Sequence, residues 1–315
     1  SLPVWRSKLE RAWPGAPVQL RMDNDGLTVE ITNCGICDLE PLRGMPLTAL
    51  YCAGNQIESL EPLRGMPLVT LNCGGNPIES LEPLRGMPLV TLLCECCKVK
   101  SLGPLRGRSL TMLNCGGNQL EDGLEPLRGM NLTWLSCWGN GISDLGPLEG
   151  MKLTALYFEA NRITSLKPLT GMPLTTLICS SNQVENLEPL RGLPLNSLHF
   201  GGNRVVDLDP VSELPLKMLS CHCNRVKTLR PLKNLVMGAL MCGGNELTGI
   251  DSFIKNPPES FLFDCDSITT DELEWIHKAW ARDVRFTAAA KETAILLALR
   301  KQDFAALKGL AHEFN

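Results

Sequence analysis

The sequence predicts an α/β solenoid, in which short parallel strands form one sheet and turns with short 3₁₀ helices form the opposite side. The first observation behind this prediction is repetition, because residues 47–67 (LTALYCAGNQIESLEPLRGMP) recur with small changes along most of the chain. The second is a constant period of 21 residues, with one step of 22 where Asp122 or Gly123 is inserted. Later copies start at Leu68, Leu89, Leu110, Leu132, Leu153, Leu174, Leu195, Leu216 and, more weakly, Met237.

The first half of each copy predicts a strand followed by a turn. Leu50 and Cys52 are two residues apart, so on an extended strand both side chains face the core while Tyr51 faces the other way. Asn55 then turns the chain, and its amide can pair with backbone groups of its own turn and the neighbouring one. Cys97 replaces this asparagine in the third of these repeats, so we expect hydrogen bonds to be lost there.

The second half of each copy predicts short 3₁₀ pieces. Pro62 and Gly65 recur in most copies, and proline and glycine at this density prevent a long helix.

Segments without the repeat flank the array. Residues 3–13 predict a short amphipathic helix, and residues 18–22 and 27–31 predict a hairpin around the turn at 23–26. We interpret residues 1–25 as an N-terminal cap and residues 26–268 as about 12 repeats. Residues 269–315 carry three helical patterns and are interpreted as a C-terminal helical cap.

The repeat resembles the leucine-rich repeat family, and the resemblance covers residues 26–268. It is similar to the LxPLxGMPLTxLxCxxN variety of bacterial proteins, some of which carry the array beside a serine/threonine kinase domain. The matching residues are Leu60, Pro62, Leu63, Gly65, Met66, Pro67, Leu68, Leu71, Cys73 and Asn76 and their later equivalents. The resemblance implies a horseshoe with a parallel β-sheet on its concave side. The chain contains no kinase signature, so an associated kinase would lie outside it.

The cysteines indicate a reducing compartment. The chain has 14, and most fall at one inward repeat position, where Phe158 and Phe200 also occur. A position that accepts Cys or Phe is a core position, and parallel stacked side chains disfavour disulfide geometry. We therefore expect free thiols and a cytoplasmic location. Because the chain begins at Ser1 without a methionine, we expect a processed or trimmed N-terminus, which leaves export possible.

Composition and motifs argue against several functions. A net charge of −4 disfavours general nucleic-acid binding, and no apolar run is long enough for a membrane span. We expect no enzyme, cofactor or catalytic residue, because there is no nucleophile motif, phosphate loop or zinc spacing. Cys34 with Cys37, and residues 221–223 (CHC), are too poor in ligands for a metal site.

The segment E-P-L-R recurs on the outer side, from Glu40–Arg43 to Glu188–Arg191. It could form a charged docking stripe, but we favour solvated pairs that compensate one another.

The open face of the sheet is the candidate site. Trp134, Trp138 and Tyr157 project from adjacent repeats of a chain that has six Trp and two Tyr. We expect them to be solvent-exposed and to border a hollow at Gly116, next to Glu95. The candidate partner-binding residues are Glu95, Asn114, Trp134, Trp138, Tyr157, Glu159, Ile178 and His199.

Exposed aromatic clusters are often interface anchors, so we expect a protein or peptide partner on the concave face. One alternative is a structural or regulatory scaffold arm, for example kinase-linked, that contacts partners through its C-terminal helices. A small-molecule sensor is a third, less favoured because an open sheet buries ligands poorly.

Overall fold

The computed structural model describes residues 2–248 and 260–262, and the single residues 274, 277, 278, 281, 294 and 297. The predicted C-terminal helical cap, residues 269–315, lies almost wholly outside the described residues, as does most of the repeat before it. The chain divides into two compact units, Ser1–Ile163 and Thr164–Asn315, which we describe one at a time.

The first unit begins with a helix and a hairpin, as the sequence predicts. Helix α1 (Leu2–Ala12) contacts strand β1 and the first 3₁₀ turn, and Leu9 in α1 is fully buried. Strands β1 (Gln19–Asp23) and β2 (Gly26–Glu30) pair antiparallel across a two-residue turn. Their position before the repeats supports the capping role, which stays a prediction.

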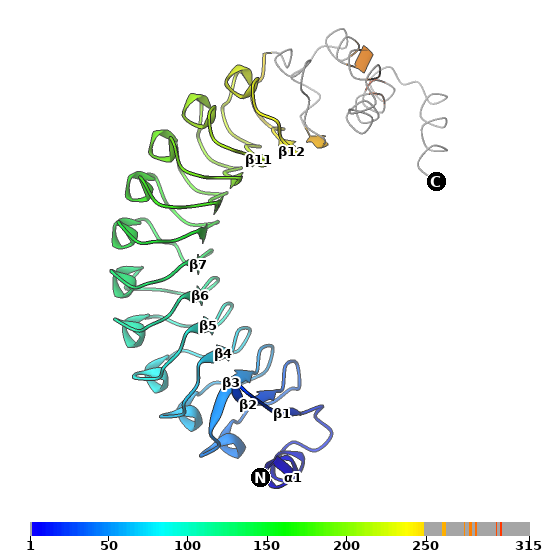
Figure 1. Cartoon of the computed structure of the whole chain (residues 1–315), viewed down its shortest axis with the longest axis vertical. Helices are drawn as coiled ribbons and strands as arrows, with labels where there is room; N and C mark the ends of the chain where they lie inside the picture. The colour runs from blue at the N-terminus through cyan, green and yellow to red at the C-terminus, as the bar shows by residue number, and fades with distance from the viewer. Residues whose placement is uncertain are drawn as a thin grey trace. The chain divides into compact units, whose positions relative to one another are not determined.

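From β2 onward the strands of this unit pair in parallel and follow sequence order, as Figure 1 shows. They are β3 (Leu47–Tyr51), β4 (Thr70–Asn72), β5 (Thr91–Leu93), β6 (Met112–Asn114), β7 (Trp134–Ser136) and β8 (Ala155–Tyr157). Leu50, Leu71 and Leu92 are Cα partners on successive strands, so each repeat contributes one rung to the stack. The 21-residue period is therefore the spacing of the rungs.

Short 3₁₀ helices connect the strands on the side opposite the sheet and confirm the predicted turns. In the first unit they are η1 (Glu40–Leu42), η2 (Glu61–Leu63), η3 (Glu82–Leu84), η4 (Gly103–Leu105), η5 (Glu125–Leu127) and η6 (Gly146–Leu148). Each has its proline in the first turn, where the missing N–H costs nothing, and its leucine in the core.

Leucine and cysteine columns form the core. Cys52, Cys73, Cys94, Cys115 and Cys137 occupy one inward position on successive rungs, and all are fully buried. All cysteines of the described part are free thiols, and burial raises the pKa of Cys52 to about 12. Thiolate formation is therefore suppressed. The thiols of this column are unreactive and pack as hydrophobic core side chains.

An asparagine ladder closes the turn after each strand. The Asn55 side chain donates to the carbonyls of Ile31 and Cys52 and accepts the N–H groups of Cys34 and Ile36. Asn76 and Asn118 repeat this pattern one and three rungs later. The predicted role of these asparagines is confirmed.

Cys97, which takes the asparagine position of its repeat, keeps more of the ladder's hydrogen bonds than the sequence analysis expects. Its Sγ lies 3.5 Å from the Cys73 carbonyl and 3.6 Å from the Glu95 carbonyl, so the thiol keeps weak donor contacts. Burial raises the pKa of Cys97, but the backbone N–H groups of Asn76 and Ile78 lower it in part, so the sulfur also keeps part of the acceptor role of an asparagine oxygen. The Ile78 N–H also bonds to the Asn76 carbonyl at 2.8 Å. The expectation of lost hydrogen bonds is therefore only partly right, because weaker contacts of the sulfur replace those of the asparagine amide.

The second unit repeats the same construction. Its described strands are β9 (Thr176–Ile178), β10 (Ser197–His199), β11 (Met218–Ser220), β12 (Ala239–Met241) and β13 (Ser260–Leu262), each parallel to the next. Its 3₁₀ helices are η7 (Lys167–Leu169), η8 (Glu188–Leu190), η9 (Asp209–Val211) and η10 (Arg230–Leu232).

Candidate functional site

The open face of the sheet is the face whose side chains alternate with the buried ones. On β7 and the residues after it, Leu135 and Cys137 enter the core while Trp134, Ser136 and Trp138 lie on the open face. This alternation follows from the two-residue period of a strand.

Trp134, Trp138 and Tyr157 gather on the open face, and we name them the aromatic patch. The rings of Trp134 and Tyr157 are 5.1 Å apart between centroids, with planes tilted by 41°. Ser136 lies between the two tryptophans and is only 5% exposed, which indicates that the patch covers it. The three aromatic residues are half-buried, so they are less exposed to solvent than the sequence analysis expects. They pack on the sheet and still present surface to a partner.

Trp138 fills the hollow that the sequence analysis expects at Gly116. A Cβ added to Gly116 would lie 2.2 Å from Nε1 of Trp138, and one added to Gly117 would lie 2.8 Å from Cη2. The indole therefore lies across both glycines. The predicted vacancy is wrong because a glycine beside a tryptophan leaves room that the tryptophan itself occupies. Glycine here makes the sheet surface flat enough to receive the ring.

Glu95 and Glu159 carry carboxylates that the protein leaves partly unsatisfied. The Glu95 carboxylate folds over Gly74, since a Cβ added there would lie 2.7 Å from Cδ and Oε1. The Oε2 atoms of Glu95 and Glu159 are closed off from solvent and accept no hydrogen bond within the described part of the chain. Burial raises the pKa of Glu159 above its ordinary value, although its own backbone N–H partly offsets this.

These side chains stand in one column along the stack. Backbone hydrogen bonds link Glu95 to Gly116 through the Cys96 N–H, and Gly116 to Trp138 through the Gly117 N–H. A third bond, from the Gly139 N–H to the Glu159 carbonyl, continues the column. The order is thus Glu95, Gly116, Trp138, Glu159, one residue per rung.

Asn114 supports the backbone of the site and is less suited to contact a partner directly. Its Oδ1 accepts the Gly116 N–H at 3.2 Å, and its Cα partners on the flanking strands are Leu93 and Ser136. The amide therefore fixes the backbone beneath the Trp138 ring.

Ile178 and His199, the remaining predicted residues, belong to the second unit. They are Cα partners on β9 and β10, and both are half-buried on the open face. Burial, followed by the charge of His222, lowers the pKa of His199, so its imidazole is neutral at neutral pH.

Two serine–histidine contacts in the second unit resemble nucleophile–base pairs. Ser197 Oγ lies 3.1 Å from His199 Nε2, and Ser220 Oγ lies 2.7 Å from His222 Nδ1. Ser220 is 1% exposed, so it cannot reach a substrate, and within the described residues no carboxylate hydrogen-bonds to either imidazole.

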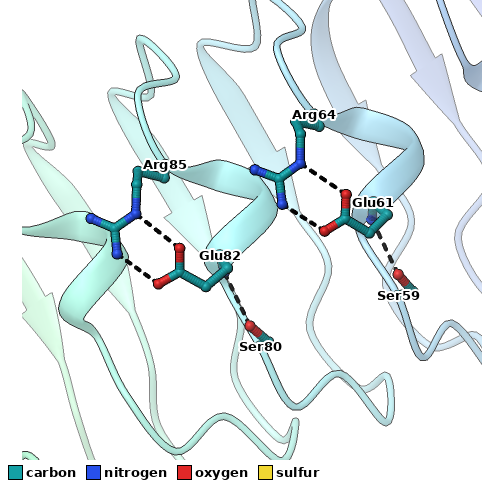
Figure 2. A network of polar contacts seen from close by, with 6 residues as sticks. All are labelled: Ser59, Glu61, Arg64, Ser80, Glu82 and Arg85. Atoms are coloured by element: carbon teal, nitrogen blue, oxygen red, sulfur yellow. Dashed lines mark hydrogen bonds and ion pairs between the residues drawn. The ribbon is translucent and has the colours of Figure 1, made fainter.

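The E-P-L-R segments form paired charges within each repeat. Figure 2 shows Arg64 and Arg85 each gripping the glutamate three residues earlier through two hydrogen bonds of 2.6 to 2.8 Å. The arginine hydrogen bonds hold the pKa of Glu61 and Glu82 below its ordinary value. Each of these glutamates is exposed to solvent and forms an ion pair with the arginine of its own repeat, so the interpretation as compensating pairs fits better than a docking stripe.

Sequence reasoning missed two features. A shallow hollow of about 780 Å³ lies over β2–β4, and its lining includes Thr28, Thr48, Tyr51 and the Arg21–Glu30 ion pair. Asn140 Oδ1 is buried without a partner in the described part of the first unit. The sequence signal available at this place was the 22-residue repeat that precedes Asn140.

Among the described residues, no three His, Cys, Asp or Glu side chains gather in a way that could hold a metal ion. In the same part of the chain, no helix has the length and hydropathy required to cross a membrane.

Comparisons with known proteins identify the fold. No model of a protein family matches the chain, and no curated protein sequence does. The crystal structure of an internalin, inlF from Listeria monocytogenes, superposes with a TM-score of 0.63 at 24% identity, covering 72% of this chain and 77% of that one.

Two further structures agree. The functional domain of InlJ from Listeria monocytogenes, which includes a cysteine ladder, gives a TM-score of 0.60 at 27% identity over 77% of this chain and 54% of that one. The APL1 leucine-rich repeat domain gives 0.56 at 20% identity over 76% and 66%. The chain thus has the leucine-rich repeat fold, and it spans about half the length of the InlJ chain.

Proposed function

We propose that this leucine-rich repeat chain is a non-enzymatic recognition module that binds a protein or peptide partner on the open face of its first unit. The open face is the one that the sequence analysis expects to be concave. The observation that carries the proposal is the aromatic patch, because it presents three half-buried rings on a face otherwise lined largely by small or short side chains. Half-buried Trp and Tyr held by packing lose little entropy when a partner covers them, and such residues dominate binding energies.

The flanking residues suit the same role. Glu95 and Glu159 supply negative charge on either side of Trp138, and Asn114 holds the backbone under the indole. Ile178 and His199 would extend recognition in the second unit, a role that we propose on their half-buried position alone.

Binding is favoured over catalysis by the state of the reactive groups. The column cysteines have raised pKa values, and Ser220 is closed off from solvent. The same free thiols favour a reducing compartment such as the cytoplasm, because oxidising compartments pair cysteines.

A selection experiment tests this proposal. A displayed peptide library is selected on the wild-type chain, with counter-selection on a Trp134→Ala/Trp138→Ala double variant. Peptides that survive are measured by titration against both proteins. As hot-spot residues, the two tryptophans should together account for about 2 kcal/mol or more, which is a loss of at least about 30-fold in affinity.

Tyr51→Ala is the matched control. Tyr51 occupies the same column as Tyr157, is 37% exposed, and lies on β3, away from the patch. It should leave affinity unchanged. Thermal melts accompany each titration: equal affinity for the wild type and the double variant, with equal melts, would remove the patch as the binding site. A collapsed melt of the double variant would show that its tryptophans serve packing alone.

A further inference from the structure

We propose that the column from Glu95 to Glu159 binds an extended basic peptide, with cationic residues at positions i and i+4 and an apolar residue at i+2. This inference rests on the proposed function and specifies the chemistry of its partner.

The charge of the partner follows from the two carboxylates. Each has one oxygen withdrawn from solvent, and no cation of the described part forms an ion pair with either residue. A carboxylate that has lost water without gaining a partner carries an unfavourable free energy, and a cation supplied by a ligand recovers it. Elsewhere on this unit the opposite arrangement holds, since the outer glutamates are already neutralised by arginines. Among the described residues, Glu95 and Glu159 are the carboxylates that combine an oxygen closed off from solvent with the lack of a hydrogen-bond partner for that oxygen.

The spacing of the partner's cations follows from the rungs. Glu95 and Glu159 are three rungs apart, through Gly116 and Trp138. At about 4.8 Å per rung this separation is about 14 Å. An extended peptide lying along the stack advances about 3.4 Å per residue, so four residues span the same distance. Side chains at i, i+2 and i+4 also share one face of an extended peptide.

The apolar middle position follows from Trp138. Its indole lies across Gly116 and Gly117, which places the ring between the two carboxylate positions of the column. Met112, which is 37% exposed, is the Cα partner of Trp134 and adds apolar surface beside the patch. A leucine or phenylalanine at i+2 would bury this surface.

The raised pKa of Glu159 agrees with an uncompensated carboxylate. A bound cation favours the charged form, so binding must lower this pKa and release protons wherever Glu159 is partly protonated. Affinity therefore rises with pH through the pKa of Glu159 and then becomes constant.

Three synthetic peptides of equal composition test the inference. Each contains two lysines and one leucine in a glycine–serine background. The lysines are placed at positions i and i+1, i and i+4, or i and i+8. Titrations use the whole chain as wild type, as Glu95→Gln/Glu159→Gln and as Glu61→Gln/Glu82→Gln, the last being a charge-matched control on the outer side. The peptide with lysines at i and i+4 should bind the wild-type chain at least about tenfold more tightly than the other two peptides. This preference should weaken as the salt concentration rises.

The variants decide the interpretation. Glu95→Gln/Glu159→Gln should abolish the preference for four-residue spacing, and the outer control should keep it. Equal affinity of all three peptides, no binding by any of them, or a preference that survives the open-face double variant would each overturn the inference. If partners from the peptide selection still depend on Trp134 and Trp138 in those cases, the proposed function stands and only its basic spacing rule fails.

Discussion

Replacing Asn118 by alanine tests the hydrogen-bond ladder more sharply than any other change. The Asn118 amide donates to the carbonyls of Cys94, Cys115 and Gly116, and its oxygen accepts the Val99 N–H at 2.9 Å. The Cys115 carbonyl also receives Asn140 Nδ2, and the Gly116 carbonyl also receives the Cys96 N–H. The substitution therefore leaves two buried groups without any partner in the described structure, the Cys94 carbonyl and the Val99 N–H.

The neighbouring ladder residue gives the comparison. Asn76→Ala removes bonds to the carbonyls of Cys52 and Cys73, but these keep Asn55 Nδ2 and the Cys97 thiol respectively. Only the Ile57 N–H loses its partner there. An unsatisfied buried group costs about 1–3 kcal/mol, so Asn118→Ala, which leaves two such groups, should cost about 2–6 kcal/mol and Asn76→Ala about half of that.

The cause of the difference is Cys97, which occupies the asparagine position of its repeat and makes no bond to the Cys94 carbonyl. Cys97→Asn should restore that bond and reduce the cost of Asn118→Ala by about 1 kcal/mol. Equilibrium urea denaturation, followed by circular dichroism, measures the free energies of unfolding. Equal losses for Asn118→Ala and Asn76→Ala, or no rescue by Cys97→Asn, would refute this account of the ladder.

Three further predictions follow from the structure. Under native conditions, alkylation mapped by mass spectrometry should modify the exposed Cys37, Cys96 and Cys223 quickly and the buried column thiols only after unfolding; fast labelling of Cys94 or Cys115 would contradict the core assignment. Gly116→Ala should displace the Trp138 ring and change tryptophan fluorescence and near-ultraviolet circular dichroism, whereas the control Gly103→Ala, whose added Cβ meets only Ser101 Oγ at 3.1 Å, should change neither. Because burial raises the Glu159 pKa above 4.5, the folded state binds the proton more tightly, so stability falls as pH rises through that pKa. Glu159→Gln should therefore raise the melting temperature at pH 7 and have no such effect well below pH 4.5; a lower melting temperature at pH 7 would show that the carboxylate is compensated.

The repeat architecture could be predicted from the sequence because each repeat has nearly the same residue pattern. Leu50, Asn55 and Pro62 recur at one spacing, and that spacing predicts the strand, the turn and the 3₁₀ helix. The hairpin and the N-terminal helix were also predictable, since both depend on local turn and helix signals.

The details of the site were not predictable, because they depend on the direction in which side chains lie along the stack. Periodicity places Trp138 and Gly116 on the same face, but only the fold shows that the ring of one lies over the other. The sulfur contacts of Cys97 and the orphan oxygen of Asn140 are similar cases, since both arise where one repeat departs from its neighbours. The repeat motif predicts what all rungs share, whereas the candidate binding surface depends on residues that differ from one rung to the next.

Because the period is constant, residues on the open face of the first unit are spaced at regular intervals along the stack. Each 21 residues of sequence correspond to one rung, so gene duplication or deletion of a single repeat changes distances on the open face in fixed steps of about 4.8 Å. Loss of the repeat that carries Gly116 would bring Glu95 and Glu159 one step closer, and it would also remove the two glycines on which the Trp138 ring lies. Such a chain would present a differently spaced pair of carboxylates after one genetic event.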